Sequence, residues 1–147
     1  MSVITTDILV EGMRRDDVFD WLSDPAHIGR ILEGAFDELT DRGGGRWDVR
    51  VPTPPRPRTM GIVFIAPDSS HGGRRILLET TGKRTSGKLN MSLRTMKPST
   101  NTLVTIRLDY DPGRLIGAVL NGAGMQAELE GGFRKLLENL ARELPRR

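Results

Sequence analysis

Hydrophobic and polar positions follow two different repeats along the chain, one of about two residues and one of about 3.6. Residues 3–10 alternate β-branched and polar side chains and predict a first strand. Further runs of this kind follow, separated by turns rich in glycine, proline or polar residues. We expect these strands at residues 36–41, 46–52, 58–67, 74–82, 87–96 and 101–111. Such alternation predicts an antiparallel sheet with one buried and one solvated face.

The helical repeat appears first between the opening strand and Gly34. Residues 14–24 carry acidic side chains in their first turn and an apolar face that includes Val18, which predicts a short helix. Asp24 and Pro25 end this helix, because a residue before proline disfavours the helical conformation. Asp24 then serves as N-cap and Pro25 as first residue of a second short helix, which ends before Gly34.

The last third of the chain returns to the helical repeat. Residues 125–144 place apolar side chains along one wide stripe, and Pro145 ends the pattern. The pair Gly131-Gly132 lies inside this helix and costs about 2 kcal/mol of helix propensity. We expect the pair either to bend the helix or to admit a close neighbour. Only this long helix can cover the apolar face of a seven-stranded sheet, so the order predicts one α+β domain over residues 1–147.

Composition narrows the class of protein. The 147 residues include no cysteine, which excludes disulfides and thiolate metal sites and agrees with a reducing cytoplasm. The net charge is only +3, and two tryptophans, one tyrosine and four phenylalanines are too few for a base-stacking platform, so we expect no nucleic-acid partner. We expect no signal peptide and no transmembrane segment, and therefore a cytoplasmic protein.

Metal and nucleophilic chemistry find little support. The two histidines, His27 and His71, lie far apart in the sequence, and neither has a ligand at the i, i+4 spacing of a zinc site. No serine occupies a Gly-x-Ser-x-Gly turn, and the glycine-rich segments join strands instead of a strand to a helix. We therefore expect no metal and no cofactor. His71 is predicted in a solvated turn, and His27 on the surface, with ligand contact as the alternative.

The order of elements resembles a known superfamily. The segment ILVEGMRRDDVFDWLSDPAHIGRILEG, residues 8–34, is similar to the N-terminal signature of START-like (SRPBCC) proteins. Its part LSDPAHIGRILEG, and the segment 87–120, resemble the carbon monoxide dehydrogenase branch of that superfamily in particular. The resemblance implies a helix-grip fold, in which a seven-stranded antiparallel sheet curls around a long C-terminal helix and encloses a hydrophobic cavity. It implies no conserved catalytic group.

Sheet phase and the helix stripe then predict the side chains that line such a cavity. The expected lining residues are Val49, Val51, Ile62, Phe64, Leu78, Leu89, Met91, Leu93, Ile106, Leu108, Met125, Leu129 and Phe133. The alternative is that these residues fill an ordinary core. Tyr110 shares the inward phase, and Glu79 lies where the phase is ambiguous, so these two are the candidates for acid–base chemistry.

Three functions remain open at this point. The first is a carrier or binding protein for a small hydrophobic molecule, lipid-like or aromatic, oriented by one or two polar groups. The second is an enzyme of the polyketide cyclase or dehydrase type that uses a cavity tyrosine or carboxylate. The third is a protein-interaction module, which requires a filled core and a large exposed apolar patch.

Overall fold

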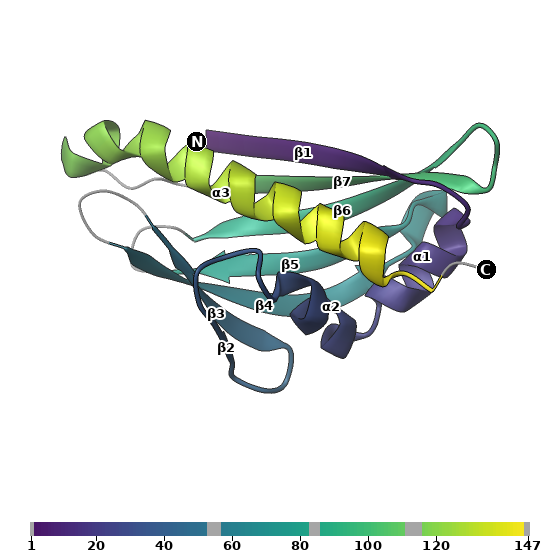
Figure 1. Cartoon of the computed structure of the whole chain (residues 1–147), viewed down its shortest axis with the longest axis horizontal. Coiled ribbons are helices and arrows are strands. Elements are labelled where there is room, and N and C mark those ends of the chain that lie inside the picture. Colours follow the sequence, from purple (N-terminus) through teal and green to yellow (C-terminus); the bar gives the residue numbers. More distant parts are fainter. Residues whose placement is uncertain (1, 53–56, 83–85, 111–115, 146–147) are drawn as a thin grey trace.

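A seven-stranded antiparallel sheet and three α-helices make up the fold (Figure 1). The computed structural model describes residues 2–52, 57–82, 86–110 and 116–145, with side chains for all of these except residues 2 and 116–125. The sheet order is β1-β7-β6-β5-β4-β3-β2. The strands are β1 (Ser2–Val10), β2 (Leu39–Asp41), β3 (Arg46–Val51), β4 (Arg58–Asp68), β5 (Arg75–Thr81), β6 (Gly87–Met96) and β7 (Asn101–Tyr110). The helices are α1 (Arg15–Leu22), α2 (Pro25–Leu32) and α3 (Ile116–Glu143), with a short 3-10 turn at Ser70–Gly72.

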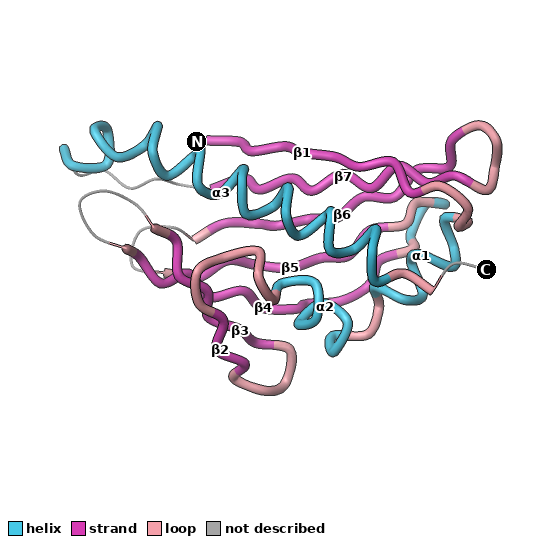
Figure 2. Tube along the Cα trace, in the orientation of Figure 1, coloured by secondary structure: helices cyan, strands magenta, loops and turns pink. Residues whose placement is uncertain are grey.

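The sheet curves around α3, which lies across it and packs along β1 (Figures 1 and 2). The strands after β2 follow one another as neighbours, and β1 closes the order against β7. In β7 every second residue from Thr102 to Tyr110 is buried, so one face is covered and the other is open to solvent. The predicted α+β architecture with its long C-terminal helix is confirmed. No helix in the described part of the chain is apolar enough over sufficient length to span a bilayer.

One predicted strand is shorter than its sequence pattern suggested. The run 36–41 was expected to be a strand, but β2 covers only Leu39–Asp41. The backbone N–H of Ala35 donates to the Leu32 carbonyl, which closes a turn after α2. Phe36 then points toward α3 and packs on Phe133 instead of pairing within the sheet. The pattern was wrong here because a tertiary contact of Phe36 replaced the strand pairing.

The corner between the two short helices forms as its residues predict. Asp24 is the N-cap of α2, and its Oδ1 accepts a hydrogen bond of 3.0 Å from the backbone N–H of Ala26. Pro25 occupies the first turn, where a missing N–H costs nothing. At the far end of α2, the Nδ2 group of Asn139 in α3 donates to the carbonyls of Ile31 and Glu33 at 3.0 Å each. The two short helices therefore brace the C-terminal half of α3.

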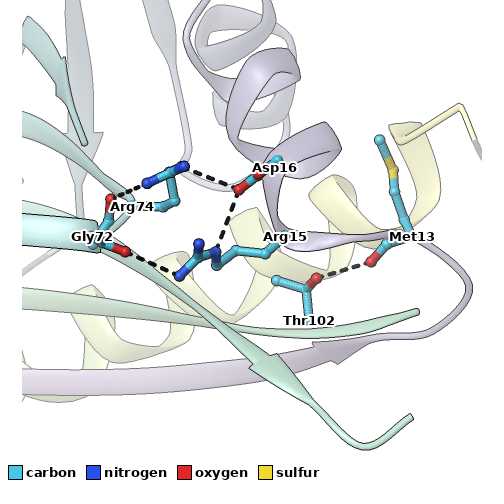
Figure 3. A network of polar contacts seen from close by, with 7 residues as sticks. Met13, Arg15, Asp16, Gly72, Arg74 and Thr102 are labelled. Atoms are coloured by element: carbon cyan, nitrogen blue, oxygen red, sulfur yellow. Dashed lines mark hydrogen bonds and ion pairs between the residues drawn. The ribbon is translucent and has the colours of Figure 1, made fainter. Parts of the chain in front are cut away.

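Polar contacts fix the start of α1 to the sheet (Figure 3). The Nη1 group of Arg15 donates to the Gly72 carbonyl at 3.3 Å, and the Nε group of Arg74 pairs with Asp16 at 3.1 Å. The hydroxyl of Thr102, which is fully buried, donates to the Met13 carbonyl at 2.8 Å. These bonds join α1 to the turn after β4 and to β7, so the helices cannot slide freely over the sheet.

Candidate functional site

The α3-covered face of the sheet is apolar over almost its whole extent. Phe64 is the exception among the predicted lining residues that can be placed, because it is only half-buried and lies beside Gly45 near the start of α2. The side chain of Met125 lies outside the described residues. The remaining predicted residues are each at most 5% exposed: Val49, Val51, Ile62, Leu78, Leu89, Met91, Leu93, Ile106, Leu108, Leu129 and Phe133. Such burial fits a packed core as well as a ligand-lined face, so their contact with a ligand stays a prediction.

Tyr110 places a hydroxyl on this apolar face. The residue is 2% exposed, and Gly87 separates it from the buried Thr80 in one row of the sheet register. Within the described residues, the Tyr110 hydroxyl has no hydrogen-bond partner. No sealed side-chain nitrogen or oxygen in that part of the chain lacks a partner, so this hydroxyl reaches accessible space. It can therefore donate a hydrogen bond to a molecule that enters beside α3.

Glu79 lies on the other face of the sheet. In β5 the buried positions are Ile76, Leu78 and Thr80, and Glu79 between them is exposed. Its register partner Lys88 is exposed as well. The suggestion that Glu79 acts inside the cavity is therefore wrong, because three consecutive apolar residues at 76–78 concealed the phase of this strand.

The two histidines are engaged elsewhere. The Nδ1 group of His27 donates to the Trp21 carbonyl at 2.6 Å, and the two rings stack with centroids 4.2 Å apart. His71 is exposed in the 3-10 turn Ser70–Gly72, as predicted. Across the described ranges no three acidic or histidine side chains gather into a possible metal site.

A hollow of about 330 Å³ opens between α3 and the loop that follows α2. Phe36 lies at this opening, where its ring meets Phe133 edge-to-face with centroids 5.9 Å apart. A methyl group on Gly132 would lie 2.8 Å from Cδ1 of Phe36, so only glycine allows this contact. The prediction that the glycine pair of α3 admits a close neighbour is thus confirmed for Gly132. The lining residues are Gly34, Ala35, Phe36, Asp37, Pro52, Glu128, Gly131, Gly132 and Lys135.

A larger cleft of about 760 Å³ lies between α2 and the turn joining β2 to β3 (Figure 2). Trp47 of β3 lines it, and its indole Nε1 lies 2.9 Å from where a Cβ of Gly29 would stand. Sequence reasoning missed this cleft, since it treated Gly43, Gly44 and Gly45 simply as a hairpin turn. The available signal was a triple-glycine turn next to a tryptophan. The lining residues are Asp24, Pro25, Ala26, Gly29, Arg30, Glu33, Leu39, Asp41, Gly43, Gly44, Gly45 and Trp47.

Comparisons with known proteins agree with this architecture. Residues 1–145 match the family described as polyketide cyclase/dehydrase and lipid transport. No curated protein matches the chain significantly. The solution structure of the KanY protein shares 14% identity with a TM-score of 0.70, over 97% of both chains. The crystal structure of TTHA0849 from Thermus thermophilus shares 13% identity with a TM-score of 0.64, also over 97% of both chains.

A third similar structure comes from a larger protein. DynU16, from the dynemicin biosynthetic locus, shares 18% identity with a TM-score of 0.60, and the match covers 98% of this chain and 47% of DynU16. At such identities these likenesses show the fold alone. The family is broader than the carbon monoxide dehydrogenase branch, so the resemblance to that branch stays a prediction.

Proposed function

Because the chain belongs to the polyketide cyclase/dehydrase and lipid transport family, we propose that it binds a small hydrophobic ligand between the sheet and α3. The ligand is lipid-like or aromatic, and the protein acts as its carrier. The observation that carries this proposal is the apolar α3-covered face with the unpartnered hydroxyl of Tyr110 on it. A cytoplasmic location is part of the proposal and rests on the sequence.

Affinity and orientation would come from different groups. Removing apolar surface from water contributes about 25 cal/mol per Å², which favours any nonpolar molecule of suitable shape. A hydrogen bond to a group that is otherwise unpartnered adds direction, since Tyr110 gains a bond without losing one within the protein. We therefore infer a ligand with an apolar body and one oxygen or nitrogen acceptor. The hollow beside Phe36 supports an entry route on that side of α3.

Native mass spectrometry tests the proposal. The purified protein is measured before and after extraction with organic solvent, and a co-purifying mass that the extraction removes supports a carrier. The extracted protein is then titrated with N-phenyl-1-naphthylamine, a neutral probe that fluoresces in apolar surroundings. A bare mass together with no fluorescence response would overturn the proposal.

Two variants localise the binding. Tyr110→Phe removes the hydroxyl and keeps the ring, so we expect it to weaken an acceptor-bearing ligand several-fold. Glu79→Gln changes a neighbouring strand on the exposed face and should leave binding unchanged. An equal loss in both variants would contradict placement of the ligand on the α3 side.

An enzyme of the cyclase or dehydrase type is the second candidate, and the Tyr110 hydroxyl favours it as well. With Glu79 on the outer face, Tyr110 is the remaining candidate for moving a proton within the interior. A catalytic role predicts that Tyr110→Phe binds a polyketone substrate and fails to convert it, whereas a carrier shows no conversion in either form. The split between binding and turnover separates the two functions.

The protein-interaction hypothesis has less support. The large apolar side chains exposed in the described part of the chain are Val3, Leu9 and Ile65. Val3 and Leu9 lie on the edge strand β1, while Ile65 lies on β4, which is separated from β1 by β7, β6 and β5. Scattered single residues of this kind are normal on a protein surface. They do not form the continuous patch that a docking face requires.

A further inference from the structure

The cleft between α2 and the β2–β3 turn is a second place where a ligand can bind. We propose that this cleft binds a small aromatic amine, whose oxygen accepts from the indole N–H of Trp47 and whose ammonium group pairs with carboxylates at the rim. The site is separate from the interior beside α3, and the proposal stands whether or not that interior binds a ligand.

Trp47 supplies the observation that points to a ligand. The residue is 3% exposed, and a buried tryptophan normally finds a partner for its N–H. No residue within the described ranges accepts from this N–H. Since no sealed nitrogen or oxygen there is left without a partner, the N–H is not closed off in the core. It reaches the cleft that Trp47 lines, where it can donate to an incoming acceptor.

The walls of the cleft leave room for a slender molecule beside the indole. Gly29 presents bare helix backbone next to Nε1 of Trp47, and a Cβ at this position would stand 2.9 Å from that nitrogen. Opposite α2, Gly43, Gly44 and Gly45 all have positive φ values of 78°, 63° and 78°, a conformation that glycine adopts without strain. The volume of about 760 Å³ lies within the usual range for small-molecule sites. A flat ring can therefore approach the tryptophan closely.

The charges at the rim select the sign of the ligand. Asp24, Glu33 and Asp41 line the cleft, and Arg30 is the basic residue among its described lining. Asp24 and Asp41 each accept one backbone N–H through Oδ1, from Ala26 and Gly43 respectively, and each keeps a second oxygen. Carboxylates outnumber the guanidinium, so a cation is favoured over an anion. Together with the indole donor, this points to an amine that also carries an acceptor oxygen.

Three phenols that differ only in charge test this selection. Tyramine is cationic, 4-ethylphenol neutral and 4-hydroxyphenylacetate anionic, and all three present the same ring and oxygen. The readout is the indole N–H signal of Trp47 in a ¹⁵N-correlated NMR spectrum. The chain has two tryptophans, and Trp21→Phe assigns the signals. We expect saturable movement of the Trp47 signal, with tyramine about fivefold tighter than 4-ethylphenol and the anion weakest.

Variants at the rim provide the control. Glu33→Gln with Asp41→Asn removes two charges and keeps an acceptor for the Gly43 N–H, so the turn is preserved. Tyramine should then bind no more tightly than 4-ethylphenol. The stacked indole of Trp21, away from the cleft lining, serves as an internal reference. No movement of the Trp47 signal, movement confined to residues beside α3, or equal binding of all three phenols by the unmodified protein would overturn the proposal.

Discussion

Phe36 in the loop after α2 packs its ring directly on the backbone of Gly132 in α3. A methyl group at position 132 would stand 2.8 Å from Cδ1 of Phe36, which is closer than real Cβ contacts come. The same ring meets Phe133 edge-to-face, with an interplanar angle of 84°. The neighbouring Gly131 has nothing within 4 Å of a Cβ built on it. Two adjacent glycines in one helix thus have different roles.

Gly132→Ala and Gly131→Ala should therefore change stability in opposite directions. We expect Gly132→Ala to destabilise the protein by about 1–3 kcal/mol, because Phe36 must move from its site. Gly131→Ala should stabilise it by up to about 1 kcal/mol, because alanine favours the helix and meets no neighbour. Urea unfolding at equilibrium measures both. Similar effects from the two variants would show that Phe36 does not rest on Gly132.

Sequence reasoning located the elements well where a local rule was strong. Asp24-Pro25 marked the corner between the short helices, and strict alternation in 101–111 gave the inward phase of Tyr110. It failed at Phe36, which fits a strand pattern until α3 is placed, and at Glu79, where three apolar residues in a row hid the phase. In both cases the deciding contact joins residues far apart in the sequence.

The ligand-related features were harder to foresee. An apolar residue on an inward strand position is buried whether it contacts a ligand or another side chain, so periodicity alone could not separate a lining from a core. The cleft at Trp47 depends on α2 lying beside the β2–β3 turn, which no local pattern specifies. Glycines marked both hollows, because backbones approach closely only where side chains are absent.

Asn139 should be essential for holding α2 against α3. Its Nδ2 group donates to the carbonyls of Ile31 and Glu33, and its Oδ1 accepts from Arg142. Asn139→Leu leaves two carbonyls of α2 without their donor, so we expect a loss of about 2–3 kcal/mol in thermal or urea unfolding. Arg142→Leu removes only the outer bond of this group and should cost less. An equal loss in both variants would contradict the assigned role.

Thr102→Val should destabilise the protein by about 1–2 kcal/mol without changing its fold. The buried hydroxyl of Thr102 donates to the Met13 carbonyl at 2.8 Å, and valine has nearly the same shape but no donor. Thr105→Val, on the other face of the same strand, is the matched control because it makes the same chemical change where the side chain is half-exposed. Equal unfolding midpoints for the two variants would show that the Met13 bond contributes nothing.

Asp68 should make stability depend on acidity below about pH 4. Hydrogen bonds from the Ser70 side chain and backbone N–H, and then from Arg75, lower the pKa of Asp68 from 3.8 to about 2. The folded state therefore releases this proton more readily than the unfolded state does. The contribution is complete above the unfolded pKa and is lost as the pH falls through the folded value.

The difference in stability between the unmodified protein and Asp68→Asn measures this contribution. We expect it to be constant above about pH 5 and to shrink progressively between about pH 4 and pH 2. Arg75→Gln should reduce its size without removing it, because the bonds from Ser70 remain. Added salt should have a smaller effect than loss of Ser70, since salt screens the charge of Arg75 but leaves the hydrogen bonds intact. A difference that stays constant down to pH 2 would contradict a lowered pKa.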